Sequence, residues 1–152
     1  MRLVLAAVGR LRPALREAAD DYLARIGRYA RIEEREVREA ARAPSVAAAL
    51  AAEAERLAVQ LPDAARLVVL ERTAAPWSSE QLAQHLDRWR LEARPVALVV
   101  GGSHGLAPAL VGRAEARWSF GPLTLPHELA RVVALEQLYR GFTILRREPY
   151  HK

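Results

Sequence analysis

The chain has 152 residues, of which 51% are hydrophobic and 27% are charged, and its formal net charge is +5. This length suits one domain with its own core, so we expect a single domain over residues 1–152. No run approaches the ~20 apolar residues of a membrane-spanning helix. The chain contains no cysteine, which excludes disulfides, thiolate metal ligands and cysteine nucleophiles, and fits a reducing cytoplasm.

The positive charge comes almost entirely from arginine. The chain has 23 basic residues, and Lys152 is the single lysine among them. Arginine suits planar, bidentate contacts with phosphate, which makes a nucleic acid a reasonable partner. A compositional bias toward arginine and alanine, visible in the run from Ala47 to Ala52, explains the same numbers equally well.

The first half of the chain alternates between strand and helix patterns. An apolar run over Arg2–Val8 predicts a strand, and a helical period follows over Pro13–Tyr29. The charged stretch Arg31–Glu39 has β-branched residues and is typical of an edge strand. Ser45 can cap a helix that reaches Leu61. The charges from Arg31 to Arg42 suggest nothing more than a solvated surface.

The second half continues the alternation. Two short apolar runs, Arg66–Leu70 and Pro95–Val100, are typical of buried strands. Between them, Ser78 and Gln81 form the capping box of a helix, with Trp77 able to pack on Leu82. The remaining expected elements are a helix over Pro108–Arg113, a strand over Ala116–Trp118 and a helix over Pro126–Gly141. Repeated strand–helix alternation predicts an α/β fold, with a mainly parallel sheet flanked by helices.

A glycine-rich turn follows the strand that ends at Val100. Its sequence is Gly101-Gly-Ser-His-Gly105, and Gly101, Gly102 and Gly105 let backbone groups approach a ligand closely. Parallel sheets bind ligands at this position, after the carboxyl end of a strand. A tight turn with no ligand accounts for the same glycines, so both readings stay open.

The last helix is apolar on two sides. Leu135, Leu138 and Phe142 cover one side, and the other carries Leu129 and Val133 together with Glu136 and Arg140. One side can face the sheet while the other faces a second copy of the chain, which predicts a two-fold dimer. Glu136 and Arg140 can pair four residues apart, either to set the register of an interface or to orient a substrate or cofactor.

Polar and aromatic residues continue to the last position of the chain. None of its four histidines shows the spacing of a metal site, so we expect no metal. His127 begins the last helix, and Tyr150 and His151 stand in a tail that also holds Arg146 and Arg147. A tail that combines cations with aromatic rings is suited to binding RNA. The ordinary alternative is that these residues form a frayed chain end.

Four motifs in order resemble the ribosomal RNA large subunit methyltransferase H family. They are Leu98-Val-Val-Gly-Gly-Ser-His-Gly-Leu106, Leu123-Thr-Leu-Pro-His127, Glu136-Gln-Leu-Tyr-Arg140 and Pro149-Tyr-His-Lys152. The resemblance extends to essentially the whole chain and implies the SPOUT-type α/β fold, with a C-terminal trefoil knot that composition or periodicity could not suggest. It also implies a homodimer that uses S-adenosylmethionine to methylate N3 of a pseudouridine in large-subunit (23S) ribosomal RNA, within the ribosome.

The resemblance also assigns residues to the cofactor. By motif matching these are Leu70, Gly101 and the run Phe120, Gly121, Pro122, Leu123, Thr124 and Leu125, and Gly102 and Gly105 join them as parts of the same turn. Because Ser119–Pro122 varies among relatives, only backbone contacts would be preserved there.

The pseudouridine N3 proton must leave, so a base or a cation is needed near it. His127, Arg140, Tyr150 and His151 are the candidates, without assigned roles, and the tail of one subunit is expected to meet the knot of the other. The alternatives are a ribosome-associated RNA-binding or assembly factor without catalysis, and a SPOUT methyltransferase that acts on transfer RNA.

Overall fold

The computed structural model describes residues 1–152 and contains one 5-stranded sheet. The strand order is β2-β1-β4-β3-β5, and every neighbouring pair is parallel, which confirms the expected sheet. The elements in chain order are β1 (Arg2–Val8), α1 (Pro13–Ile26), β2 (Arg31–Val37), α2 (Val46–Gln60), β3 (Arg66–Leu70), α3 (Ser79–Leu91), β4 (Val96–Val100), α4 (Pro108–Gly112), β5 (Ala116–Trp118) and α5 (His127–Leu145).

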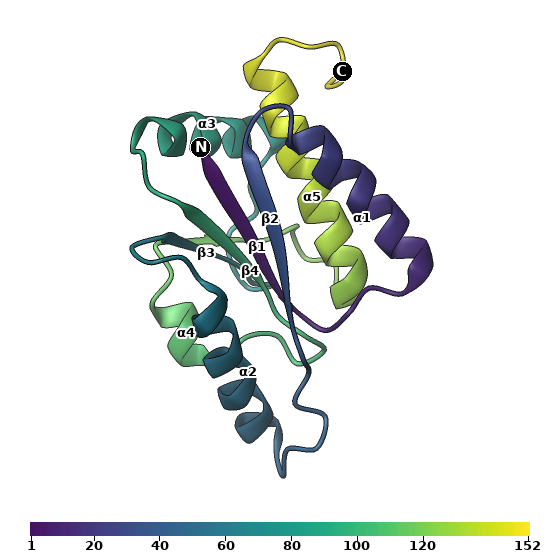
Figure 1. The fold of residues 1–152 in the computed structure, drawn as a ribbon, viewed down its shortest axis with the longest axis vertical. Helices are drawn as coiled ribbons and strands as arrows, with labels where there is room; N and C mark the ends of the chain where they lie inside the picture. The colour runs from purple at the N-terminus through teal and green to yellow at the C-terminus, as the bar shows by residue number, and fades with distance from the viewer.

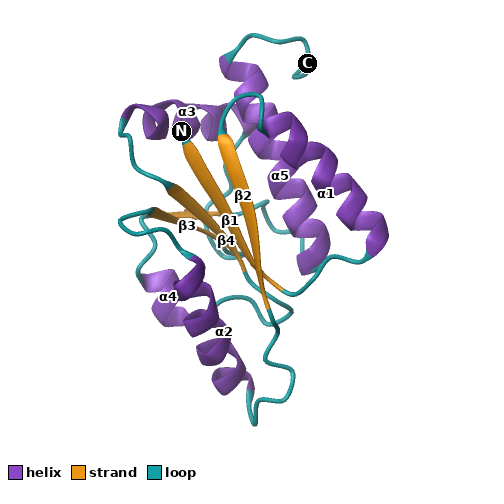
Figure 2. Cartoon of the chain, viewed as in Figure 1, coloured by secondary structure: helices purple, strands orange, loops and turns teal.

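Helices cover both faces of the sheet. Figure 1 shows α1, α3 and α5 on one side and α2 and α4 on the other, and Figure 2 shows the twisted strands between them. Alternate residues of β1 serve the two layers: Leu5 lies in the core beneath α3 and α5, whereas Ala6 packs in the core that includes Leu57 of α2 and Leu110 of α4. None of the helices is long and apolar enough to span a bilayer.

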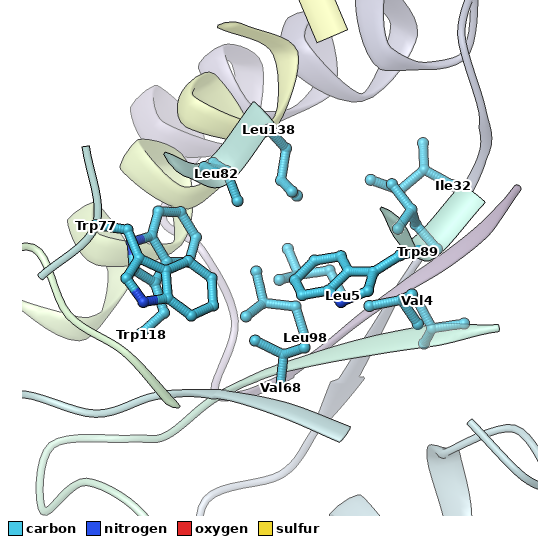
Figure 3. Close-up of a pocket in the computed structure, with 12 residues that line it drawn as sticks. Val4, Leu5, Ile32, Val68, Trp77, Leu82, Trp89, Leu98, Trp118 and Leu138 are labelled. Carbon is cyan, nitrogen blue, oxygen red and sulfur yellow. The ribbon is translucent and has the colours of Figure 1, made fainter. Parts of the chain in front are cut away.

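The start of α3 forms as its sequence predicts. The Ser78 side chain accepts a hydrogen bond from the Gln81 backbone N–H, and the Gln81 side chain accepts one from the Ser78 N–H. Trp77 and Leu82 line one small void in the core (Figure 3). Its volume is about 10 Å³ and its lining is entirely hydrophobic, so it is a gap in the packing and not a ligand site.

Two helix ends differ from the expected positions by three residues or more. Helix α1 ends at Ile26, three residues before Tyr29, and the chain then turns through Gly27 and Arg28. Helix α5 continues past Gly141 to Leu145. A Cβ atom on Gly141 would lie 2.7 Å from a methyl carbon of Leu86, so this glycine allows α3 and α5 to approach closely and does not end the helix.

The charged strand β2 lies at the edge of the sheet, as expected, but it is not merely solvated. Its residues Glu34 and Glu36 pair with Arg131 of α5 at 3.3 Å and 2.6 Å. The Arg131 side chain is fully buried and also donates hydrogen bonds to the carbonyl oxygens of Val8 and Gly9. These contacts attach α5 to the ends of β1 and β2. The knot that the resemblance implies stays a prediction.

Candidate functional site

A large cavity opens at the carboxyl edge of the sheet. Its volume is about 780 Å³, within the range of small-molecule sites. The ends of β3, β4 and β5 contribute to it, together with the segment that precedes α5. Every position assigned to the cofactor except Pro122 lines it, namely Leu70, Gly101, Gly102, Gly105, Phe120, Gly121, Leu123, Thr124 and Leu125. The fold therefore brings three separate parts of the chain to one cavity.

The glycine turn after β4 has its own structural reason for glycine. A Cβ atom on Gly101 would lie 2.2 Å from the carbonyl oxygen of Gly105, a clash between backbone segments of the same turn. Gly105 has φ +81° and its N–H donates to the carbonyl oxygen of Gly102 at 3.0 Å. The tight-turn reading thus accounts for Gly101 and Gly105 without a ligand, and the case for a ligand depends on the cavity around them.

The segment before α5 presents unused backbone donors. The backbone N–H groups of Leu123, Thr124 and Leu125 donate no hydrogen bond within the protein. Before them, the chain is held by buried Ser119, whose hydroxyl oxygen accepts a hydrogen bond from the Gly121 N–H at 3.0 Å. A fixed segment with free amides beside a cavity is suited to binding a planar heterocycle through its edge.

One wall of the cavity is charged. Glu71 accepts hydrogen bonds from the hydroxyl and the N–H of Thr73, and the hydroxyl contact is the main reason that the pKa of Glu71 lies below its ordinary value. Arg72 and Arg117 line the same wall, and Arg72 Nη1 lies 3.4 Å from the Thr124 hydroxyl oxygen. The Glu71 carboxylate is thus occupied by its hydrogen bonds to Thr73, while Arg72 and Arg117 are both exposed.

Of the four catalytic candidates, only His127 lies at this cavity. It is the first residue of α5, lines the cavity, and has its Nε2 atom 3.5 Å from a carboxylate oxygen of Glu39. The carboxylate can orient the imidazole ring through this contact. His127 is therefore placed to exchange a proton with a bound molecule.

The other three candidates form a second cluster around Glu136. One Glu136 oxygen accepts hydrogen bonds from Arg140, at 3.0 Å and 2.6 Å, and from the Tyr150 hydroxyl at 3.0 Å. The Arg140 guanidinium also lies over the Tyr150 ring, 4.7 Å from its centroid. His151 has one ring nitrogen 3.5 Å from Arg140 and the other 2.9 Å from Glu80. The tail is therefore folded back on α5.

The surroundings of Tyr150 and Arg140 determine the protonation state of each side chain, and with it the chemical roles that each can take. Burial, followed by hydrogen bonds to Tyr22 and Glu136, raises the pKa of Tyr150, so its phenol keeps its proton and acts as a donor. The hydrogen bond to Glu136 raises the pKa of Arg140, which stays cationic. Arg140 lies thirteen positions after His127 in α5, which corresponds to roughly 20 Å along the helix axis. Within one chain, the cluster and the cavity are separate.

Sequence reasoning missed several residues of this region, among them Glu39, Glu80 and Arg131. Arg131 could have been noticed, because it is a lone charge between Ala130 and Val132, and a charge in an apolar helix row needs a buried partner. Glu39 and Glu80 give no such signal, since exposed carboxylates are ordinary. No group of three or more histidine, aspartate or glutamate side chains lies close enough to hold a metal ion.

Known proteins resemble this chain over its full length. Residues 1–151 match the family described as "Predicted SPOUT methyltransferase". A protein of Pseudomonas paraeruginosa (strain PA7) named "Ribosomal RNA large subunit methyltransferase H" is 44% identical over 100% of both chains, and one of the same name from Pseudomonas putida (strain F1) is 45% identical, also over 100% of both.

Solved structures share the fold. A probable methyltransferase from Bordetella pertussis Tohama I has a TM-score of 0.53 at 21% identity, covering 92% of this chain and 93% of that one. A probable methylase family protein from Haemophilus influenzae Rd KW20 has a TM-score of 0.56 at 12% identity, covering 99% and 70%. The resemblance seen in the sequence motifs is confirmed: the chain belongs to the SPOUT methyltransferases and, within them, to the ribosomal RNA large subunit methyltransferase H family.

Proposed function

We propose that this protein transfers a methyl group from S-adenosylmethionine to N3 of a pseudouridine in 23S ribosomal RNA, within the large ribosomal subunit and as a cytoplasmic homodimer. One observation carries the proposal: a single cavity gathers Leu70, the glycine turn and the segment from Phe120 to Leu125, from three distant parts of the chain. Full-length relatives named for ribosomal RNA methylation support the choice of substrate.

The cavity suits the cofactor chemically. The free amides of Leu123, Thr124 and Leu125 can donate to the acceptor nitrogens of adenine, and the open space around the glycine turn leaves room for the ribose and the methionine portion. When bound, S-adenosylmethionine supplies an activated sulfonium methyl group. The protein then needs to align the attacking nitrogen and to exclude water, because positioning contributes much of the rate when the methyl group is already activated.

The residues around the cavity can handle the proton of the target nitrogen. His127, oriented by Glu39, lines the cavity and is our candidate for the group that accepts a proton from N3. Arg140 is a permanent cation, and Tyr150 is a hydrogen-bond donor, so each can stabilise the anion that deprotonation creates. Because Arg140, Tyr150 and His151 lie away from the cavity of their own chain, we assign them to the cavity of the partner subunit.

The free face of α5 supports a dimer. Leu129 is 38% exposed, and Val133, Glu136 and Arg140 on the same row are half-buried, whereas Leu135, Leu138 and Phe142 lie in the core. Val132, one residue from this row, also packs in the core. A row with Leu129 and Val133 at one end and the Glu136–Arg140 pair at the other has the composition of an interface between two copies.

The dimer is tested by placing a charge on that face. We expect Leu129→Asp to shift the protein from dimer to monomer in light scattering, because the aspartate would be desolvated at the interface. Val59→Asp is the matched control, since Val59 is 81% exposed on α2, on the other side of the sheet. A Leu129→Asp variant that stays dimeric would show that this face is not the interface.

The function is tested by following a labelled methyl group. Purified protein is incubated with labelled S-adenosylmethionine and ribosomes from a strain that lacks the methylation, and in parallel with transfer RNA from the same strain. We expect label in the 23S RNA, at pseudouridine N3 by nucleoside mass spectrometry. Label in transfer RNA alone would identify a transfer RNA enzyme, and cofactor binding that is absent altogether would indicate a non-catalytic assembly factor.

A further inference from the structure

The arginines at the amino ends of the strands differ from those at the carboxyl ends in whether they form ion pairs. Strands β1, β2 and β3 each begin with an arginine, and each of these is ion-paired. Arg2 and Arg31 both contact Glu33, at 3.5 Å and 3.2 Å, and Arg66 pairs with Glu92. The arginines that begin these three strands are therefore neutralised within the protein, whereas Arg28, in the turn before β2, is exposed and has no ion pair.

The carboxyl edge shows the opposite pattern. The same three strands are each followed within two residues by an arginine, namely Arg10, Arg38 and Arg72. All three are exposed, and none has a carboxylate oxygen within the 4.0 Å limit of an ion pair. Arg42, after β2, and Arg117, in β5, are likewise exposed and without an ion pair. We call Arg10, Arg38, Arg42, Arg72 and Arg117 the arginine rim.

The acidic groups near this edge are engaged elsewhere. Glu71 accepts two hydrogen bonds from Thr73, Glu39 lies beside His127, and Glu128 pairs with Arg12. The rim therefore keeps a local surplus of positive charge at the edge where the cavity opens, and Arg72 and Arg117 belong to the cavity lining itself. A compositional bias toward arginine does not by itself explain why the three arginines that begin these strands are all paired and the five rim arginines are all unpaired.

We propose that the arginine rim binds the phosphates of the RNA strand that delivers the target nucleotide to the cavity of the same subunit. This inference rests on the function proposed above and adds the surface that holds the substrate. A polyanion is the complementary partner for exposed, unpaired guanidinium groups, because each can form bidentate hydrogen bonds with a phosphate. Arg72 and Arg117 would hold the phosphates nearest the target, and Arg10, Arg38 and Arg42 those farther along the strand.

The size of the effect follows from counterion release. Each phosphate contact on single-stranded nucleic acid contributes about 0.7 to the slope of log affinity against log salt. If a phosphate contact contributes nothing to affinity at ~1 M salt, this slope makes one contact worth roughly fourfold in affinity at ~0.15 M salt. Two contacts are then worth roughly 15-fold. Two arginines removed together should therefore lower the salt slope by about 1.4.

The test compares two double variants of the rim with a double variant elsewhere. Arg10→Gln/Arg38→Gln and Arg72→Gln/Arg117→Gln each remove two rim cations. Arg88→Gln/Arg90→Gln is the control, because these exposed arginines lie in the last turn of α3 and the change in charge is the same. The substrate is the ribosome from a strain that lacks the methylation, with KM, kcat and the salt dependence of KM as readouts, and calorimetry for S-adenosylmethionine.

We expect both rim variants to raise KM for ribosomes roughly 15-fold at ~0.15 M salt and to flatten its salt dependence. The kcat and cofactor affinity of Arg10→Gln/Arg38→Gln should stay within twofold of wild type, because neither residue lines the cavity, and the control should match wild type throughout. Active wild-type enzyme with rim variants of unchanged KM would overturn the inference and leave the proposed function intact. An equal rise in the control would also overturn it, because net charge would then explain the effect. A wild-type protein that methylates no ribosomal RNA would refute the proposed function itself.

Discussion

Replacement of Arg131 by methionine should destabilise the protein strongly. The guanidinium is fully buried and holds Glu36 at 2.6 Å, Glu34 at 3.3 Å and the Gly9 carbonyl oxygen at 2.7 Å. Methionine fills a similar volume but leaves two carboxylates and the carbonyl without this partner. Breaking a buried pair from one side costs about 3–5 kcal/mol. Because Arg16 still contacts Glu34 at 2.6 Å, we expect the lower end, about 3 kcal/mol.

Urea unfolding at one fixed protein concentration measures this loss. With a slope of about 2 kcal/mol per molar urea, Arg131→Met should lower the midpoint by about 1.5 M. Arg12→Met is the control, because Arg12 pairs with Glu128, which lies one turn of α5 before Arg131. The Arg12 side chain is 65% exposed, and an exposed pair of this kind contributes no more than about 1 kcal/mol. If Arg131→Met cost no more than the control, the attachment of α5 to β1 and β2 would not depend on this residue.

Three further outcomes test other parts of the structure. Gly101→Ala should weaken S-adenosylmethionine binding at least about tenfold in calorimetry, since a Cβ atom would meet the Gly105 carbonyl oxygen at 2.2 Å; wild-type affinity would contradict the assigned turn. Deletion of residues 150–152 should abolish methyl transfer and keep cofactor affinity, whereas full activity would leave the tail a packing role alone. Burial, and then the Glu148 hydrogen bond, raise the pKa of Tyr29 to about 12. Its contribution to stability is complete below about pH 10 and is lost as the pH rises toward 12, so Tyr29→Phe should flatten this alkaline decline in the free energy of unfolding; an unchanged decline would refute it.

The elements that could be predicted well from the sequence are those determined by residues close together in the chain. The capping box of Ser78 and Gln81 spans three residues, and the strands around Leu5 and Val99 follow from short apolar runs. The position of the Gly101 turn could also be predicted, because the loops that follow parallel strands all lie at the carboxyl ends of those strands. The structure has this turn in the lining of the cavity.

The features that sequence could not predict depend on contacts between distant parts of the chain. Arg131 meets Glu36 across 95 positions, so the buried role of the charged strand could not be inferred from periodicity. Gly141 has the appearance of a helix end, yet its reason lies in the Leu86 side chain of α3. The tail residue Tyr150 packs on Arg140 of its own chain, and only the fold shows that this cluster and His127 are at different ends of α5.

The central claim is that one cavity, between the glycine turn and the segment before α5, holds S-adenosylmethionine. Two-dimensional ¹⁵N NMR of the full protein during a cofactor titration tests it most directly, because each backbone amide reports its own environment. We predict the largest shift changes at Gly101, Gly102, Gly105 and the free amides of Leu123, Thr124 and Leu125. Changes confined to the tail cluster around Glu136, or no changes at saturating cofactor, would contradict the assignment.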